Sequence, residues 1–297
     1  MTDAITIMKK PASLLLATDL NSRSDRALDR AVALAREWDA ALTVLHVIDP
    51  AEVRRARHRD RDTPSWRRPP DPVRAIEAAL RRDLAGELPN LRVAVREGDV
   101  ADIVSSFAAT EQCDLIITGV ASHSLFGRSI LGSTVDALIR EQTVPVLVVK
   151  NRAHGPYQSV TIATDFSEAS RAGLRVAASW FGDRQLCLFH SFEVPFGQVL
   201  DKGNFSETLR DMERLTAEEF LDDPMVPDEA RLRIRVLIEY GRPETMLRRY
   251  VEDVGTDLIV LGSQGRSMAF EAFVGSTATR LLAELPSDML VVRGGAT

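Results

Sequence analysis

Short segments in the first half of this 297-residue chain recur in the second half in the same order. ATDL at 17–20 returns as ATDF at 163–166, DLIITG at 114–119 returns as DLIVLG at 257–262, and GST at 132–134 returns at 275–277. Because the order is kept and the spacing slips only slightly, we infer duplication of one domain. The predicted domains are residues 1–150 and 151–297, and the segment Asn151–Gln158 with its Gly-Pro pair is the predicted linker.

Each half alternates apolar runs with segments of helical period, which predicts an α/β protein. The predicted strands of the first half are Ser13–Thr18, Leu42–Ile48, Leu91–Arg96, Leu115–Thr118 and Val146–Val149. Those of the second half are Ser159–Thr164, Gln185–His190, Arg231–Ile238, Leu258–Leu261 and Met289–Val292. The predicted helices follow an N-cap at Ser22, span Pro72–Leu88, Val100–Ala109 and Ser133–Arg140, and begin near Ser167, Phe205, Pro243 and Ser276. We therefore expect two doubly wound, five-stranded parallel sheets with helices on both faces.

The segment Glu52–Arg74 breaks this pattern. It is rich in arginine and proline and has no apolar period, so we interpret most of it as an exposed connection. The other interpretation is a lid or arm that meets a phosphate or an acidic partner.

Composition excludes several classes of function. The net charge is −6, which disfavours general nucleic-acid binding, since that needs a basic surface. Two cysteines, one in each half, indicate neither a disulfide framework nor a metal pair, and a reducing cytoplasm is the expected location. Met1–Lys10 has no apolar core typical of a signal peptide, and no run is long enough to span a membrane.

A glycine pattern marks the last strand–helix connection. Gly262 and Gly265 follow the apolar strand, and Gly275-Ser276 comes nine residues later at the start of a helix. Glycine at a strand end allows positive φ and close approach of the backbone to a ligand. A helix start offers N–H groups and the positive end of its dipole. Together they predict an anion site at the carboxyl edge of a parallel sheet.

This spacing resembles the nucleotide-binding pattern of the universal stress protein family, and the whole chain resembles a tandem member of it. The resemblance implies flavodoxin-like, or adenine nucleotide alpha hydrolase-like, domains that bind ATP, with Mg²⁺ accompanying the triphosphate. It implies that Asp165 contacts the adenine–ribose portion and that Ser191 lines the adenine pocket through its backbone. It further implies that Gly262, Gly265, Gly275 and Ser276 contact phosphate and ribose. Arg266, within the loop, is either a phosphate partner or a surface side chain.

The first half departs from the family pattern at one position. The resemblance carries the same roles to Asp19, Val47, Gly119, Gly132 and Ser133, but Ser122 stands where the second glycine belongs. A side chain at this position disfavours the left-handed backbone conformation and leaves a ligand less room to approach the backbone. His123 and Arg128 in that loop either contact phosphate or lie in solvent. We interpret the strand-end histidines, His46 and His190, as packed rather than catalytic, because neither has a partnered acid or nucleophile.

The sequence lacks the residues of several enzymes. It has no GxxxxGK[ST], no GxGxxG after the first strand, and no HExxH or CxxC. We therefore predict no catalytic residue and at most slow ATP hydrolysis. The expected function is an ATP-binding stress-response or energy-sensing regulator that acts through conformation or an unidentified protein partner. The alternatives are a weak ATPase or adenylate-transferring enzyme, and a nucleotide-independent interaction module.

The closing strands of both halves are apolar, and edge strands invite pairing. In the family these strands pair between subunits, so the resemblance implies a pseudo-dimer of the two halves or a dimer of chains. The second half has Ser287-Asp288 where the family usually has prolines, which predicts a changed start to the last strand.

Overall fold

The computed structural model describes residues 9–20, 24–59, 66, 71–120, 132–193, 204–263 and 276–294. These residues form two compact units, and we describe each by itself. Within the described ranges, the N-terminal unit comprises residues 11–120 and 132–156. The C-terminal unit comprises residues 157–294 together with Lys9 and Lys10.

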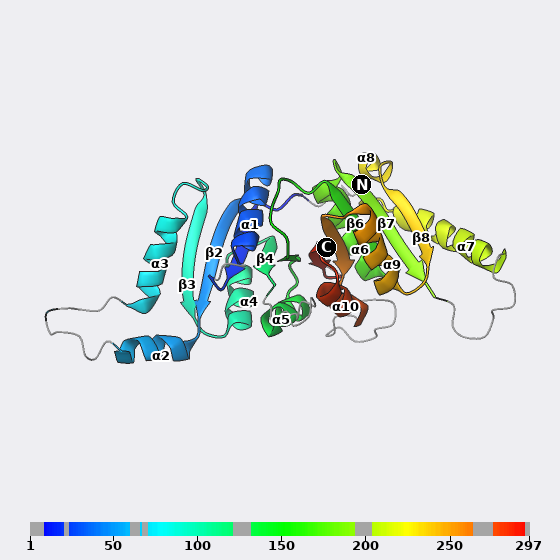
Figure 1. The fold of residues 1–297 in the computed structure, drawn as a ribbon. Coiled ribbons are helices and arrows are strands. Elements are labelled where there is room, and N and C mark those ends of the chain that lie inside the picture. The colour runs from blue at the N-terminus through cyan, green and yellow to red at the C-terminus, as the bar shows by residue number, and fades with distance from the viewer. Residues whose placement is uncertain are drawn as a thin grey trace, which may run out of the picture. The chain divides into compact units, whose positions relative to one another are not determined.

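The N-terminal unit is a parallel sheet in the order β3-β2-β1-β4-β5 (Figure 1). Its strands are β1 (Ser13–Thr18), β2 (Ala41–Ile48), β3 (Leu91–Glu97), β4 (Leu115–Gly119) and β5 (Val146–Val149). Its helices are α1 (Ser24–Trp38), α2 (Pro50–Arg59), α3 (Pro72–Asp83), α4 (Val100–Thr110) and α5 (Ser133–Glu141). The direction of winding reverses between β1 and β4, which places a topological switch point at their carboxyl ends.

The C-terminal unit repeats this topology in the order β8-β7-β6-β9-β10, again with every pair parallel. Its strands are β6 (Ser159–Thr164), β7 (Gln185–Phe192), β8 (Arg235–Tyr240), β9 (Leu258–Gly262) and β10 (Asp288–Val292). Its helices are α6 (Glu168–Phe181), α7 (Asn204–Leu221), α8 (Asp228–Arg231), α9 (Pro243–Val254) and α10 (Ser276–Glu284). The predicted α/β class with two doubly wound parallel sheets is confirmed.

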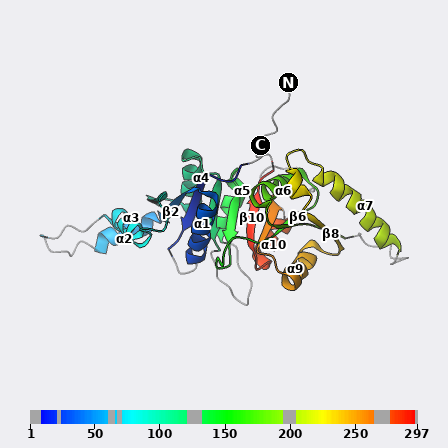
Figure 2. The ribbon, with the colours of Figure 1, turned by 90° about the horizontal axis from the view of Figure 1, so that it is seen from above.

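Helices cover both faces of each sheet. In the N-terminal unit α1 lies on one face and α4 and α5 on the other; in the C-terminal unit α6 and α7 lie opposite α9 and α10 (Figure 2). The central strands are buried on both sides, as their continuous apolar runs predict: Leu115–Thr118 and Leu258–Leu261 are buried throughout.

One aspartate in each repeat fixes the amino edge of its sheet. Asp114 accepts hydrogen bonds from the backbone N–H groups of Ala12 and Ser13, at 2.8 and 2.9 Å. Asp257 does the same for Gln158 and Ser159, at 2.8 and 3.1 Å. The repeated Asp-Leu-Ile start of β4 and β9 thus aligns the first strand of each unit with its neighbour.

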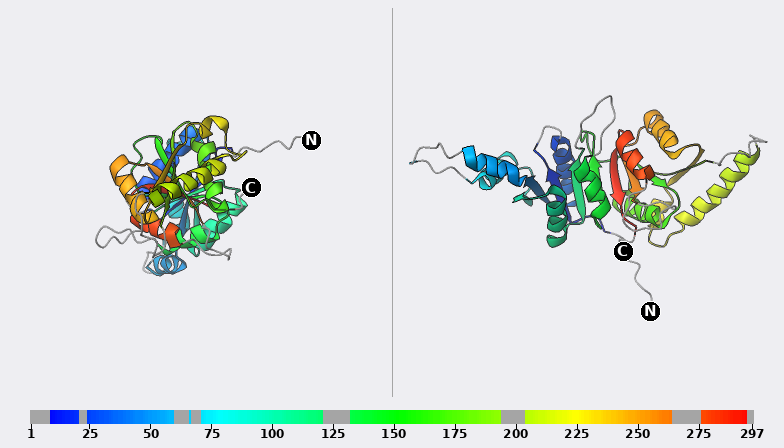
Figure 3. Two further views of the ribbon diagram at one scale, coloured as in Figure 1. Left: turned by 90° about the vertical axis from the view of Figure 1, so that its right-hand side faces the viewer. Right: turned by 90° about the horizontal axis from the view of Figure 1, so that it is seen from below.

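The exposed connection predicted for Glu52–Arg74 is wrong at its beginning, because α2 occupies Pro50–Arg59. The carboxylate of Asp49 accepts from the N–H of Ala51 at 2.7 Å, and Pro50 holds the first helical position. Among the α2 residues whose burial is described, 50–55, Val53 is the buried one, with 1% of its surface exposed. Good helix formers and a capped start therefore make a helix without an apolar stripe, at the carboxyl end of the sheet (Figures 1 and 3).

Two further boundaries differ from prediction by more than two residues. α3 ends at Asp83, not Leu88, because the chain soon reaches Gly86 in left-handed backbone with φ of 89°. The strand expected from Arg231 begins instead at Arg235. Arg231 closes the short helix α8 and forms ion pairs with Asp228 and, at 2.8 Å, with Asp222.

The C-terminal unit also includes the beginning of the described chain. The indole N–H of Trp180 in α6 donates to the carbonyl of Lys9 at 3.0 Å. Lys9 and Lys10 therefore pack with this unit, although they precede β1 in the sequence.

Candidate functional site

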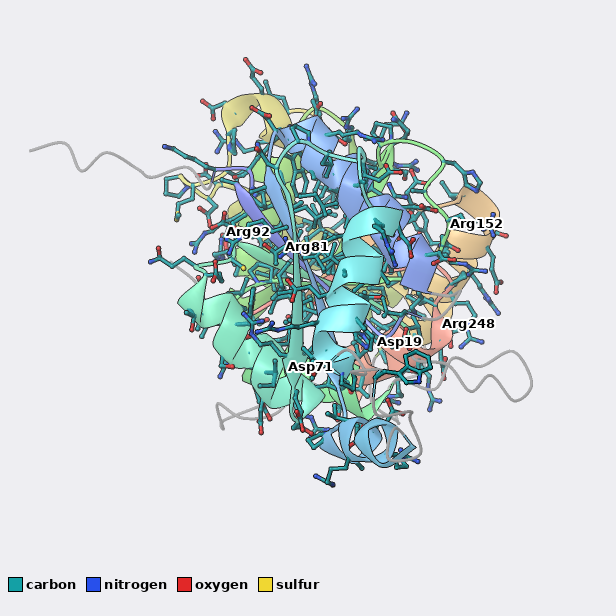
Figure 4. All side chains as sticks on the ribbon, turned by 90° about the vertical axis from the view of Figure 1, so that its left-hand side faces the viewer. Asp19, Asp71, Arg81, Arg92, Arg152 and Arg248 are labelled. Atoms are coloured by element: carbon teal, nitrogen blue, oxygen red, sulfur yellow. The ribbon has the colours of Figure 1, made fainter. Side chains whose placement is uncertain are left out.

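The residues predicted to bind nucleotide follow the strands at the switch point of each sheet. Asp19 follows β1 and Gly119 ends β4, which is hydrogen-bonded to β1. Asp165 follows β6 and Gly262 ends β9, its neighbour. Figure 4 shows Asp19 and Asp71 toward one end of the N-terminal unit and Arg81 and Arg92 toward the other. The acidic position therefore lies at the carboxyl edge, where open α/β sheets bind ligands.

A tight turn sets the position of each aspartate. The hydroxyl of Thr164 accepts from the N–H of Phe166 at 2.9 Å, and that of Thr18 accepts from Leu20 at 3.1 Å. Phe166 and Leu20 have φ of 59° and 60°, a left-handed conformation that costs a side-chain-bearing residue roughly 1–2 kcal/mol. Both repeats keep the same strained turn, which is a feature typical of functional loops.

Asp165 has a structural role in this turn. Its Oδ1 accepts from the N–H of Ser167 at 3.0 Å, and the Ser167 hydroxyl caps α6 by accepting from Ser170 at 3.2 Å. The carboxylate is half-buried, whereas Asp19 is exposed. The turn thus orients Asp165 at the sheet edge.

The histidines pack at the strand ends, as interpreted, but the expectation that neither has an acid beside it is wrong for His190, whose Nε2 lies 3.6 Å from a carboxylate oxygen of Glu213 in α7. His46 Nδ1 lies 2.8 Å from the carbonyl oxygen of Thr18, and His190 Nδ1 lies 2.8 Å from that of Thr164. Since a carbonyl only accepts, Nδ1 carries the proton in both rings. Each histidine therefore ties the second strand of its sheet to the end of the first.

Gly262 has a packing role that the sequence did not predict. Its φ lies outside the left-handed region, and a Cβ at this position would lie 2.6 Å from the carbonyl carbon of Ala169 and 2.7 Å from the nitrogen of Ser170. The close approach that this glycine permits is therefore to the first turn of α6. The expectation of a positive-φ turn at Gly262 is wrong.

The helices that follow begin where the sequence predicts. α5 starts at Ser133 and α10 at Ser276. Gly132, the N-cap of α5, has extended backbone and offers no side chain to the first turn. The N-cap residue of α5 therefore supplies no side-chain acceptor to the N–H groups at this helix start, which leaves them suited to an anion.

A cavity of about 130 Å³ lies at the carboxyl edge of the N-terminal sheet. Its lining includes Asp19, Val47 and Gly119, three residues predicted for this site, together with Val120 and Thr134. Gly132 and Ser133 do not line it. The cavity is small and largely apolar compared with ligand pockets of roughly 300–1,000 Å³.

Two buried hydroxyls take the place of these valines in the C-terminal unit. By the repeat, Ser191 corresponds to Val47 and Ser263 to Val120. Ser191 is 8% exposed and Ser263 is 4% exposed, and within the described part of the chain the hydroxyl of neither has a hydrogen-bond partner. Ser191 was predicted to contribute only its backbone, and Ser263, Thr18 and Thr164 were not among the predicted site residues. The repeated threonine before each aspartate was the available signal for the last two.

Several predicted residues lie outside the described part of the chain. They are Ser122, His123, Arg128, Gly265, Arg266 and Gly275. Among the described helices, none combines the length and apolar character needed to cross a membrane.

Fold and site together define a duplicated α/β protein with a candidate ligand site at the switch point of each sheet. The family model of the universal stress protein family matches residues 12–150 and 156–293. The chain therefore belongs to the universal stress protein family, with two such domains, which confirms the resemblance.

Relatives match along almost the whole chain. A universal stress protein of Mycolicibacterium smegmatis is 26% identical over 302 residues, covering 94% of this chain and 96% of its own. The crystal structure of a functionally unknown protein from Pseudomonas aeruginosa has a TM-score of 0.68 at 20% identity, covering 96% of this chain and 93% of that one. A universal stress protein from Archaeoglobus fulgidus gives 0.61 at 20% identity, with coverages of 96% and 99%. The two solved structures share the fold.

Proposed function

We propose that this protein is an ATP-binding regulator whose C-terminal domain holds the nucleotide. The observation that supports it most is the arrangement at the ends of β6 and β9, two hydrogen-bonded strands. The strained Thr164–Phe166 turn holds Asp165 at this edge, beside Gly262, and α10 begins at Ser276. A carboxylate acceptor for ribose or base and a helix start for phosphate suit a nucleotide.

Mg²⁺ would reach this site with the triphosphate. Within the described residues, no group of three or more His, Cys, Asp or Glu side chains could hold a metal ion. The phosphates would therefore supply most of the ligands, in keeping with the preference of Mg²⁺ for phosphate oxygens and water.

Regulation follows if ATP binds two conformations of the protein with different affinity, because only that difference shifts their populations. The N-terminal domain has a separate role in this proposal. Its cavity of about 130 Å³ is lined by Val47 and Val120, which favours a nucleotide-independent interaction function for this domain.

Thermal unfolding of the full chain with and without Mg-ATP tests the proposal. At a free concentration of about 100 times the dissociation constant, ATP should add roughly 2.7 kcal/mol to the stability of the domain that binds it. Asp165→Ala should reduce the shift, while Asp19→Ala, the matched change in the first repeat, should leave it intact. Asp165→Asn keeps an acceptor for the Ser167 N–H and controls for loss of the turn.

Absence of a shift for the wild-type chain, with no nucleotide released on denaturation, would contradict ATP binding. Release of ADP above the buffer rate, lost in Asp165→Ala, would instead favour the weak ATPase.

A further inference from the structure

We propose that the hydroxyls of Ser191 and Ser263 determine the specificity of the C-terminal site by hydrogen-bonding the nucleoside part of its ligand. The valines at the matching positions of the N-terminal repeat exclude the same ligand there. This inference rests on the proposed function and adds to it the two side chains that select the ligand.

The two hydroxyls face the same side of the sheet. A Cβ at Gly262 would point toward Ala169 and Ser170 in α6, so the side chain of the next residue, Ser263, points to the opposite face. The backbone N–H of Ser263 donates to the carbonyl of Val292 at 2.8 Å, which keeps it in the pattern of the sheet.

Ser191 faces that side by the same alternation. The ring of His190 lies 4.4 Å from that of Phe166, and its Nε2 lies 3.6 Å from a carboxylate oxygen of Glu213 in α7. His190 therefore points to the face of α6 and α7, and Ser191 points to the face of α9 and α10. The hydroxyls belong to strands on either side of β6, which ends at the turn that carries Asp165.

A buried hydroxyl without a partner lowers stability, because water no longer satisfies it. Native proteins carry few such groups, and each calls for an explanation. Two of them at one sheet edge, beside the turn that holds Asp165, are explained if a ligand supplies the missing partners.

The N-terminal repeat is an internal comparison for this chemistry. There Val47 and Val120 line one cavity with Asp19, so the two corresponding positions do meet in a single site. Valine offers the same cavity two apolar walls and no hydrogen bond. The same backbone thus presents a polar site in one repeat and an apolar site in the other.

The chemistry of a hydroxyl narrows the ligand class. Serine both donates and accepts, which suits a base edge or a ribose, where donors and acceptors lie side by side. Phosphates would lie instead toward the start of α10, where helix N–H groups and the dipole favour anions. The hydroxyls should therefore affect binding of a nucleoside triphosphate and leave binding of the phosphate chain alone unchanged.

The test is calorimetric titration of the full chain with two probes, ATP and inorganic tripolyphosphate, each with Mg²⁺. Ser191→Ala and Ser263→Ala should each weaken ATP binding about 5- to 10-fold, and tripolyphosphate binding should not change. The unliganded variants should unfold at the same temperature as the wild type or at a higher one, because an unsatisfied group has been removed. A purely structural role would instead lower the unfolding temperature.

Ser179→Ala is the matched control, since the Ser179 hydroxyl in α6 is also buried without a partner among the described residues and lies away from this edge. It should leave ATP affinity unchanged. Equal ATP binding by wild type, Ser191→Ala and Ser263→Ala would overturn the inference and leave the proposed function standing. Wild-type protein that binds no ATP would overturn both.

The reciprocal change tests the second half of the inference. In the full chain, Val47→Ser with Val120→Ser should allow the N-terminal site to bind ATP, raising the stoichiometry above that of the wild type. An unchanged stoichiometry in a folded variant would show that these valines are not what excludes the ligand.

Discussion

The phenolic hydroxyl of Tyr157 donates a hydrogen bond of 2.7 Å to Oδ2 of Asp288, 131 residues later in the chain. Tyr157 is 2% exposed and Asp288 is fully buried. The neighbouring Ser287 donates to the carbonyl of Thr256 at 2.7 Å. The start of β10 is thus held by polar contacts at the two positions where the family usually has prolines, and the strand begins one residue earlier than predicted, at Asp288.

Tyr157→Phe should destabilise the C-terminal domain by about 1–3 kcal/mol, because the buried carboxylate of Asp288 loses a donor. Urea unfolding followed by circular dichroism measures this change. Tyr240→Phe is the control, since Tyr240 is 48% exposed. Equal midpoints for the two variants would show that the bond to Asp288 adds no stability.

Of the two aspartates that follow α7, Asp222 and Asp223, Asp223 should contribute more to stability. Its side chain is 1% exposed and lies 2.9 Å from Nε of Arg175 and 3.6 Å from an amino group of Arg171. Asp223→Ala should cost about 1.5–3 kcal/mol, since it removes the charge-assisted hydrogen bond from Arg175, while Arg171 and Arg175 keep Glu168 as an ion-pair partner. Asp222→Ala removes an exposed ion pair with Arg231 and should cost less than about 1 kcal/mol. Guanidinium unfolding of both variants gives the comparison.

Gly262→Ala should destabilise the protein without any nucleotide present, by roughly 1–3 kcal/mol, because the methyl group overlaps the backbone of α6. Gly173→Ala is the matched change in α6, where the new methyl would meet its nearest neighbour at an ordinary 3.5 Å. Thermal unfolding of the two nucleotide-free variants and the wild type measures the difference in stability. A Gly262→Ala variant with wild-type stability and weakened ATP binding would assign this glycine to the ligand instead.

Thr164→Val should loosen the turn before α6, because Thr164 accepts from Phe166 and lies 2.8 Å from the hydroxyl of Ser170. We expect a loss of about 0.5–1.5 kcal/mol for each hydrogen bond and weaker ATP binding. Thr18→Val removes the equivalent turn bond to Leu20 and should leave ATP binding unchanged. Titration with Mg-ATP and thermal unfolding together separate the two effects.

Alkaline pH should destabilise the C-terminal domain through Tyr250. Burial, with a hydrogen bond to Cys187, raises the pKa of Tyr250 from 10.0 to about 12. The folded state thus keeps its proton in a range where the unfolded chain has lost it. The resulting stability is complete below pH 10 and is lost as the pH rises from 10 to about 12.

Burial also raises the pKa of the Cys187 thiol above 9.0, so the decline should begin near pH 9. Tyr250→Phe should flatten the part of the decline above pH 10. Urea midpoints measured across this range test the prediction, and parallel curves for wild type and variant would contradict it.

Periodicity and repetition were enough to predict the fold class and most strands, because buried parallel strands are continuous apolar runs. β1, β5 and β6 have the predicted bounds. α2 was missed because its stability comes from the Asp49 cap and from helix propensity, which leave no apolar period. β8 was placed too early because Arg231 continues an alternating pattern that the short helix α8 interrupts.

The site was predictable only in part. The family resemblance named Asp19, Val47 and Gly119, and these three residues line one cavity. It did not reveal the left-handed turns at Leu20 and Phe166, since those residues rarely adopt positive φ. The unsatisfied state of the Ser191 and Ser263 hydroxyls depends on what surrounds each side chain after folding, and no local pattern encodes it.

The contact between Lys9 and Trp180 bears on how this protein can be dissected. The polypeptide contributes to its second unit before it builds its first, so the two units are interleaved along the chain. A protease that cuts only within residues 151–158 would leave Lys9 and Lys10, which pack with the C-terminal unit, on the N-terminal fragment. A separately expressed C-terminal domain that keeps the contact with Trp180 would need the Lys9-Lys10 segment fused to it.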